Sequence, residues 1–113
     1  MTFIYGTAWK EADTERLVLL ALENGFRAID TANQRKHYFE AAVGSAVAKS
    51  QLPRDALWLQ TKFTFRDGQD ARLPYDPKAS TARQVEQSFA SSLEHLQVSH
   101  LDSYVLHLSL IHI

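Results

Sequence analysis

Short apolar runs and helical stripes of apolar residues alternate along this chain. Four short runs, bounded by polar residues or glycine, predict buried β-strands at residues 3–7, 27–31, 57–61 and 102–106. Between them apolar residues recur every three or four positions, which predicts amphipathic helices at 15–24, 38–49 and 85–96. The order β-α-β-α-β-α-β indicates an α/β fold with a parallel sheet and right-handed crossovers.

Residues that begin, end or interrupt helices lie at suitable places between these segments. Asp13 or Thr14 is predicted to cap the first helix, and Thr81 begins a sequence with the form of a capping box before the third. Gly25 follows the first helix, where a residue with positive φ is favoured. Gly44 lies inside the second helix, where glycine costs about 1 kcal/mol relative to alanine. We therefore expect Gly44 to permit close packing, with a strand as its neighbour.

Two architectures fit this alternation of strands and helices: a doubly wound open sheet and part of an eight-stranded barrel. A dinucleotide-binding open sheet needs a glycine-rich phosphate loop after its first strand, and Gly6-Thr7-Ala8-Trp9 does not supply one. Residues 63–79 contain one glycine and two prolines and predict a long loop, of a kind that is usually functional or mobile.

Composition excludes several classes of function. The formal net charge of −1 argues against nucleic acid as the main partner, because phosphate binding needs a clear basic excess. The absence of cysteine excludes a disulfide framework, a thiolate metal site and a thiol nucleophile. No signal-peptide pattern and no membrane-spanning apolar run is present. We therefore expect a cytoplasmic protein that acts on small molecules, without nucleic-acid or membrane partners.

Side chains capable of proton transfer are predicted at the ends of three strands: Asp30, Lys62 and His107. Tyr38 opens the helix after the second strand, close to the same rim. Since the carboxyl ends of parallel strands meet at one edge, we expect the four side chains to share one pocket. Taken alone, each residue also has an ordinary structural explanation. These are a turn former for Asp30, a solvated surface charge for Lys62, a packing aromatic for Tyr38 and an ordinary histidine at the sheet rim for His107. Their occurrence together argues against coincidence.

These four side chains suit the reduction of a carbonyl group, which needs no metal. Hydride attack on the carbonyl carbon leaves a developing alkoxide that needs a proton, and the hydroxyl of Tyr38 can give it. We expect the ammonium of Lys62 to lower the pKa of this phenol from its reference value of about 10. Asp30 would keep the ammonium charged and in place, and His107 would orient the carbonyl oxygen or share in proton transfer. The other histidines show no metal-ligand spacing and are interpreted as surface residues: His37, His95, His100 and His112.

Several stretches of the chain together are similar to one known family. Residues 25–32, continued by Val43-Gly44, resemble its first signature. Residues 52–62 resemble the segment that carries its catalytic lysine, and residues 101–107 resemble the strand that ends in its catalytic histidine. Residues 6–9 resemble the opening segment beside the nicotinamide. The sequence therefore resembles the aldo-keto reductase family over nearly its whole length.

This resemblance implies a parallel (β/α)8 barrel of the TIM-barrel type, with NADPH as the cofactor and reversible reduction of aldehydes or ketones to alcohols. Tyr38 would be the proton donor, Lys62 and Asp30 would tune it, and His107 would orient the substrate carbonyl. The resemblance also implies cofactor contacts at four positions: Gly6, Thr7, Trp9 and Asp30.

The chain departs from the family pattern in three places. The segment between Asp30 and Tyr38 is longer than usual, so that strict counting would give the tyrosine position to Arg35. We choose Tyr38 because it directly precedes the helix. Of the asparagine–glutamate pair that follows the tyrosine in the family, only the glutamate is present, as Glu40. Residues 108–113 stand where the family usually has a proline-containing loop.

A complete barrel of this class needs about 250 residues, and the sequence has 113. We therefore expect residues 1–113 to be the N-terminal half of a single reductase domain, truncated after the fourth strand. On its own this half should bind NADPH weakly or not at all, lack turnover, and self-associate through its open sheet edges, whereas the full-length form would be a monomer. The alternatives are a non-catalytic binding or regulatory module with the reductase fold, and a truncated product without function.

Overall fold

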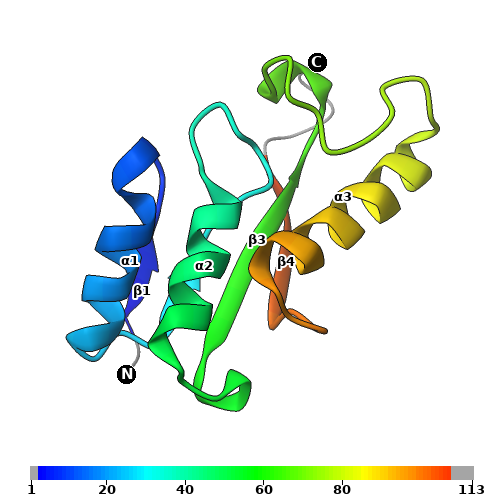
Figure 1. Cartoon of the computed structure of the whole chain (residues 1–113). Coiled ribbons are helices and arrows are strands. Elements are labelled where there is room, and N and C mark those ends of the chain that lie inside the picture. The colour runs from blue at the N-terminus through cyan, green and yellow to red at the C-terminus, as the bar shows by residue number, and fades with distance from the viewer. Residues whose placement is uncertain (1–2, 108–113) are drawn as a thin grey trace.

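The computed structural model describes residues 3–107, and within them the four strands form one parallel sheet in the order β1-β2-β3-β4. The strands are β1 (Ile4–Gly6), β2 (Ala28–Asp30), β3 (Trp58–Thr64) and β4 (Ser103–His107). Three α-helices cover one face of the sheet (Figure 1): α1 (Thr14–Glu23), α2 (Glu40–Ser50) and α3 (Thr81–Leu96). Sequential strand order with a helix after each of the first three strands confirms the predicted half of a (β/α)8 barrel.

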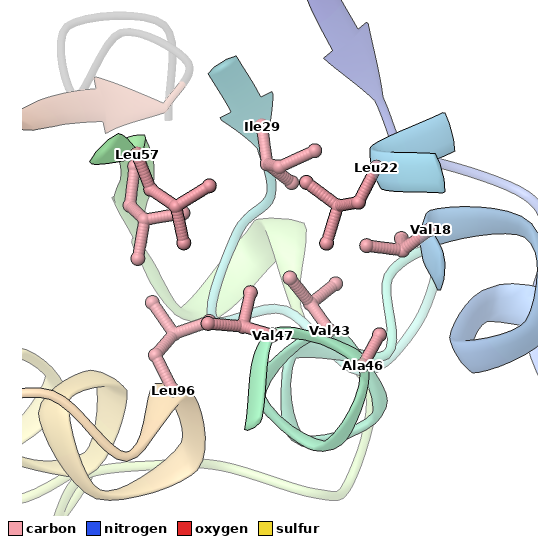
Figure 2. Close-up of a cluster of buried hydrophobic side chains, with 9 residues drawn as sticks. Val18, Leu22, Ile29, Val43, Ala46, Val47, Leu57 and Leu96 are labelled. Atoms are coloured by element: carbon pink, nitrogen blue, oxygen red, sulfur yellow. The ribbon is translucent and has the colours of Figure 1, made fainter. Parts of the chain in front are cut away.

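One apolar cluster joins the helices to the sheet. Aliphatic side chains of α1 and α2 meet the strands from the helical side, and Leu96 closes the cluster from the end of α3 (Figure 2). Burial of each large aliphatic side chain contributes about 1.5–3 kcal/mol. The cluster therefore fixes which face of the sheet is covered and leaves the other face for polar residues. Its members are Val18, Leu22, Ile29, Val43, Ala46, Val47, Leu57, Leu59 and Leu96.

Gly44 marks a contact between two helix backbones. A Cβ atom at this position would lie 1.9 Å from the carbonyl oxygen of His95 and 2.9 Å from the Cα of Leu96. The predicted close packing is confirmed, but the neighbour is α3 and not a strand. In this outer layer each helix packs against the next, α1 on α2 and α2 on α3.

The ends of the first and third helices differ in part from the prediction. Gly25 follows α1 with φ of 98°, as expected for a glycine that reverses the chain. The side chain of Asp13 makes no capping hydrogen bond, whereas the side chain of Ser80 accepts one from the backbone N of Arg83 at 3.3 Å. The cap of α3 is therefore one residue earlier than the predicted Thr81.

β3 and α2 also have different bounds from those predicted. β3 extends to Thr64, so Lys62 lies inside the strand and not at its tip. α2 begins at Glu40, so Tyr38 precedes the helix and does not open it. The expected loop begins only after Thr64, and it folds back to bury Tyr75, whose hydroxyl donates to the Thr64 carbonyl at 2.8 Å.

The two outermost strands, β1 and β4, carry large apolar side chains that are exposed within residues 3–107. Ile4 in β1 is 52% exposed and Leu106 in β4 is 55% exposed. Self-association through these edges stays a prediction, and residues 108–113 lie outside the described part of the chain. In the part that is described, none of the helices combines the length and the apolar character that a membrane span requires.

Candidate active site

The register of the sheet places the predicted site residues on the face opposite to the helices. Asp30 is the register partner of Gln60, and Thr64 is the register partner of His107. Side chains alternate along a strand, so Lys62 shares the face of Gln60 and Thr64. Their neighbours Ile29 and Leu59 point the other way, into the helical core. The carboxyl ends of three strands therefore contribute to one polar surface.

Asp30 and Lys62 form a close ion pair at the centre of this surface. The Nζ of Lys62 lies 2.7 Å from Oδ1 and 2.8 Å from Oδ2 of Asp30, and it also donates to the backbone oxygen of Thr31 at 2.9 Å. These contacts use all three donors of the ammonium. The Lys62 and Asp30 side chains are only 12% and 18% exposed, so water screens their attraction less than at an open surface.

Two polar residues that sequence reasoning missed extend this pair across the sheet. The Gln60 side-chain Nε2 donates to Asp30 Oδ1 at 2.7 Å. The Ser103 hydroxyl donates to Gln60 Oε1 at 2.8 Å, which fixes the orientation of the amide. Gln60 lies two residues before Lys62 on the same face of β3, and Ser103 is the register partner of Gln60. The two-residue spacing of Gln60 and Lys62 was the available signal for Gln60.

Tyr38 joins this group from the segment between β2 and α2. Its ring packs edge-on against the His107 ring with a centroid separation of 5.8 Å. The Nζ of Lys62 lies 5.1 Å from the centroid of the Tyr38 ring. The structure thus brings Asp30, Tyr38, Lys62 and His107 together.

The unusually long segment before Tyr38 is ordered by buried glutamines. The side-chain Oε1 of Gln34 accepts a hydrogen bond from the backbone N of His37 at 2.9 Å. The backbone carbonyl of Gln34 accepts one from the backbone N of Tyr38 at 3.0 Å. Its Nε2 donates to the Gly68 carbonyl at 2.9 Å. Gln69 donates from the other side to the carbonyls of Asn33 and Thr64. These bonds tie the extra residues to the segment after β3 and present Tyr38 to the site.

The electrostatic environment of Tyr38 differs from the expectation. Burial disfavours the phenolate and the charge of Asp30 adds to this effect, so the pKa of Tyr38 is raised above its usual value. The expected lowering of this pKa by Lys62 is therefore wrong for this structure, because burial and the charge of Asp30 outweigh it. Burial, followed by the charge of Lys62, lowers the pKa of His107. Near neutral pH the site thus holds a protonated phenol beside a neutral imidazole.

A cavity of about 380 Å³ opens beside these two rings. Tyr38 and His107 line it together with Trp9 and His37. Trp9 is 71% exposed and stacks on His37 with ring centroids 4.0 Å apart. Its φ of 63° is rare for a bulky residue, and a hydrogen bond from its backbone N to the His37 carbonyl, at 2.7 Å, holds it there. Trp9 thus lines the cavity beside Tyr38 and His107, and its contact with a cofactor stays a prediction.

The other residues expected near a cofactor differ in what they can contact. Gly6 pairs in register with Asp30, and a Cβ atom placed on it would meet nothing within 4 Å, so open space lies beside it. Thr7 is buried, and its hydroxyl donates to the Asp30 carbonyl at 2.9 Å. Its side chain therefore supports the end of β2 and is not presented to a ligand.

A buried carboxylate lies behind Tyr38, on the helical side of the sheet. Glu40 is 3% exposed, accepts a hydrogen bond from the hydroxyl of Thr61, and lies 2.8 Å from Nδ1 of His95. The interpretation of His95 as a surface residue is wrong, because its ring joins α3 to the first turn of α2. The hydrogen bond to Glu40, followed by smaller effects that include the charge of Glu94, raises the pKa of His95.

This pair predicts a stability that depends on pH. Because the pKa of His95 is raised in the folded state, its pairing with Glu40 stabilises the fold fully below the unfolded-state pKa of about 6.5. This stabilisation is lost as the pH rises through the folded-state pKa. We expect the free energy of unfolding of the native protein, relative to His95→Gln, to fall as the pH rises above about 6.5. The effect should be less than about 1 kcal/mol because the His95 side chain is 38% exposed. Urea unfolding of the native protein and of His95→Gln at each pH measures the effect, and a difference that does not change with pH would contradict it.

Comparison with known proteins identifies the family. The model of the aldo/keto reductase family matches residues 2–109. This chain belongs to that family. An aldo-keto reductase from Mycolicibacterium vanbaalenii is 37% identical over 102 residues, and the match covers 86% of this chain and 30% of that protein. An aldo-keto reductase from Mycobacterium avium is 38% identical over 98 residues, and the match covers 86% of this chain and 29% of that protein.

Solved aldo-keto reductase structures share the fold. The enzyme MGS-M4 from a deep-sea metagenome library superposes with a TM-score of 0.72 at 30% identity, covering 96% of this chain and 36% of that one. The aldo/keto reductase of Brucella melitensis gives a TM-score of 0.69 at 28% identity, and the match covers 92% of this chain and 36% of that one. The chain thus spans about a third of the length of the reductases that it matches.

Proposed function

We propose that this chain supplies the proton-donating half of an NADPH-dependent reductase that converts aldehydes or ketones to alcohols. The observation that carries the proposal is the meeting of Asp30, Tyr38, Lys62 and His107, with the rings of Tyr38 and His107 lining one cavity. Tyrosine, ammonium, carboxylate and imidazole in contact are suited to protonating a developing alkoxide. Membership of the aldo/keto reductase family supports the same reaction class.

In this proposal Tyr38 transfers the proton of its hydroxyl to the carbonyl oxygen while hydride reaches the carbonyl carbon. The raised pKa of Tyr38 keeps the phenol protonated across the neutral range, so the donor is ready. In the resting site burial and the charge of Asp30 outweigh the effect of Lys62 on the Tyr38 phenol. Once the proton has left, the ammonium of Lys62, 5.1 Å from the ring centroid and held in place by Asp30, attracts the phenolate charge. His107, neutral at this pH, donates a hydrogen bond to the carbonyl oxygen and positions it.

The residues present fit one end of a nicotinamide cofactor. Gly6 leaves open space at the end of β1, next to Asp30, and Trp9 presents an exposed aromatic face at the same rim. These residues, with Asp30, would hold the nicotinamide end. Bound NADPH would supply the hydride.

The reaction is tested on the longest form of the protein that its gene encodes. Oxidation of NADPH is followed by absorbance in the presence of a simple aromatic aldehyde, with the alcohol product identified separately. Aldehyde-dependent oxidation with equal formation of alcohol is the expected result. If the protein binds NADPH but forms no alcohol from a panel of aldehydes and ketones, the chain is a binding module and the proposal fails.

The 113-residue chain by itself should bind NADPH weakly or not at all. Only the nicotinamide end finds candidate contacts within residues 3–107, so too little binding energy is available to offset the loss of ligand freedom. Titration with NADPH, followed through the fluorescence of Trp9, measures the affinity, and Trp9→Phe shows which part of the signal comes from that residue. A micromolar dissociation constant would contradict this expectation.

A further inference from the structure

Thr64 and His107 face each other at the ends of two neighbouring strands. They are register partners, and each is the last residue of its strand. Oγ1 of Thr64 lies 2.8 Å from Nδ1 of His107. The Thr64 side chain is fully buried. Its carbonyl oxygen is also fixed, because it accepts from Gln69 Nε2 at 3.1 Å and from the Tyr75 hydroxyl at 2.8 Å. Thr64 is thus a rigid partner for the imidazole.

The direction of this hydrogen bond decides which tautomer His107 adopts. A threonine hydroxyl can donate to an unprotonated Nδ1 or accept from a protonated one. Within residues 3–107 the Thr64 hydroxyl has no second hydrogen-bond partner. If it accepted from His107, its own hydrogen would be buried without an acceptor, which carries the full cost of desolvating the donor. If it donates, the hydroxyl hydrogen and the Nδ1 lone pair are satisfied by one bond.

We propose that Thr64 is a positioning residue that donates to Nδ1 of His107 and thereby holds the imidazole in the tautomer with its hydrogen on Nε2. This inference rests on the proposed function for its catalytic meaning. The His107 ring lines the cavity beside Tyr38, and no residue of the described part bonds its Nε2. The Nε2–H is then the donor to the substrate carbonyl oxygen, and Tyr38 remains the acid.

Long-range proton–nitrogen correlation spectra of ¹⁵N-labelled protein report the tautomer directly, without cofactor or turnover. At about pH 8, where a histidine of ordinary or lowered pKa is neutral, we expect His107 to carry its hydrogen on Nε2 only. Thr64→Val removes the hydroxyl at nearly constant volume and should shift His107 toward the mixed tautomers of free histidine. Thr64→Ser keeps the donor and should retain the native pattern.

Thr61→Val is the matched control, since it makes the same change in the same strand on the opposite face. It should leave the His107 spectrum unchanged. A native His107 with its hydrogen on Nδ1 would overturn the proposal, and so would a tautomer pattern that is the same in native protein and in Thr64→Val.

The kinetic result separates this inference from the proposed function. If the protein reduces aldehydes, Thr64→Val should lower kcat by about 10- to 100-fold, which is less than the loss expected for removing the donor itself. Thr64→Ser should restore most of the rate. An Nε2–H tautomer in a protein without reductase activity would uphold the positioning role and refute the function. An active reductase in which His107 carries its hydrogen on Nδ1 would refute the positioning role and uphold the proposed function.

Discussion

Replacing Tyr38 with phenylalanine is expected to lower kcat for aldehyde reduction by about 10²- to 10⁴-fold, the range that a positioned general acid contributes. The change removes one hydroxyl oxygen and keeps the ring that packs against His107. The affinity for NADPH should therefore stay within about threefold of the native value, because the loss concerns proton transfer and not binding. Steady-state rates and a fluorescence titration of each protein measure the two quantities.

The control for this variant is Tyr104→Phe. Tyr104 is the register partner of Thr61, on the helical face, and packs against Phe89 with ring centroids 5.1 Å apart. The same chemical change there should leave kcat nearly unchanged. A Tyr38→Phe protein that keeps more than about a tenth of the native rate would show that another group protonates the product.

Gly44→Ala is expected to lower the free energy of unfolding by about 3 kcal/mol, the upper part of the range for overpacking. The new methyl carbon would lie 1.9 Å from the His95 carbonyl oxygen, and this neighbour is helix backbone that cannot rotate away. α2 and α3 would have to separate, which also pulls His95 from Glu40. Urea unfolding followed by circular dichroism measures the effect.

The sign of this change distinguishes packing from helix propensity. At an exposed helical position, glycine to alanine would stabilise the protein by about 1 kcal/mol. Ala48→Gly, at an exposed position of the same helix, measures the helix-propensity effect alone and should lower the free energy of unfolding by about 1 kcal/mol. If Gly44→Ala is neutral or stabilising, the close contact between α2 and α3 is not present in solution.

The fold could be predicted because the local signals and the global arrangement agree. Apolar periodicity gave the order of strands and helices, and Gly25 marked the turn between α1 and β2. The end of β3 was missed because a charged residue normally ends a buried run. Lys62 instead lies on the polar face of the strand, and the chain returns to buried residues at Phe63 and Thr64.

The four proposed site residues could be found from their positions after the strands, but their supporting contacts could not. Gln34 and Gln69 stand in polar segments that look solvated, and only the tertiary structure shows that their amides are buried and bonded. Glu40 and His95 are 55 residues apart, so their contact leaves no local pattern. The pKa of Tyr38 also depends on burial and on the charge of Asp30, which spacing in the sequence does not report.

The central claim is that Lys62 acts on the reaction through the hydroxyl of Tyr38. A double-mutant cycle in kcat/KM for one aldehyde tests it, with Tyr38→Phe, Lys62→Met and the double variant compared with native protein. Residues that act as one unit give losses that do not add. We predict that the double variant keeps the residual rate of Tyr38→Phe. A double variant whose loss is the product of the two single losses would contradict the claim.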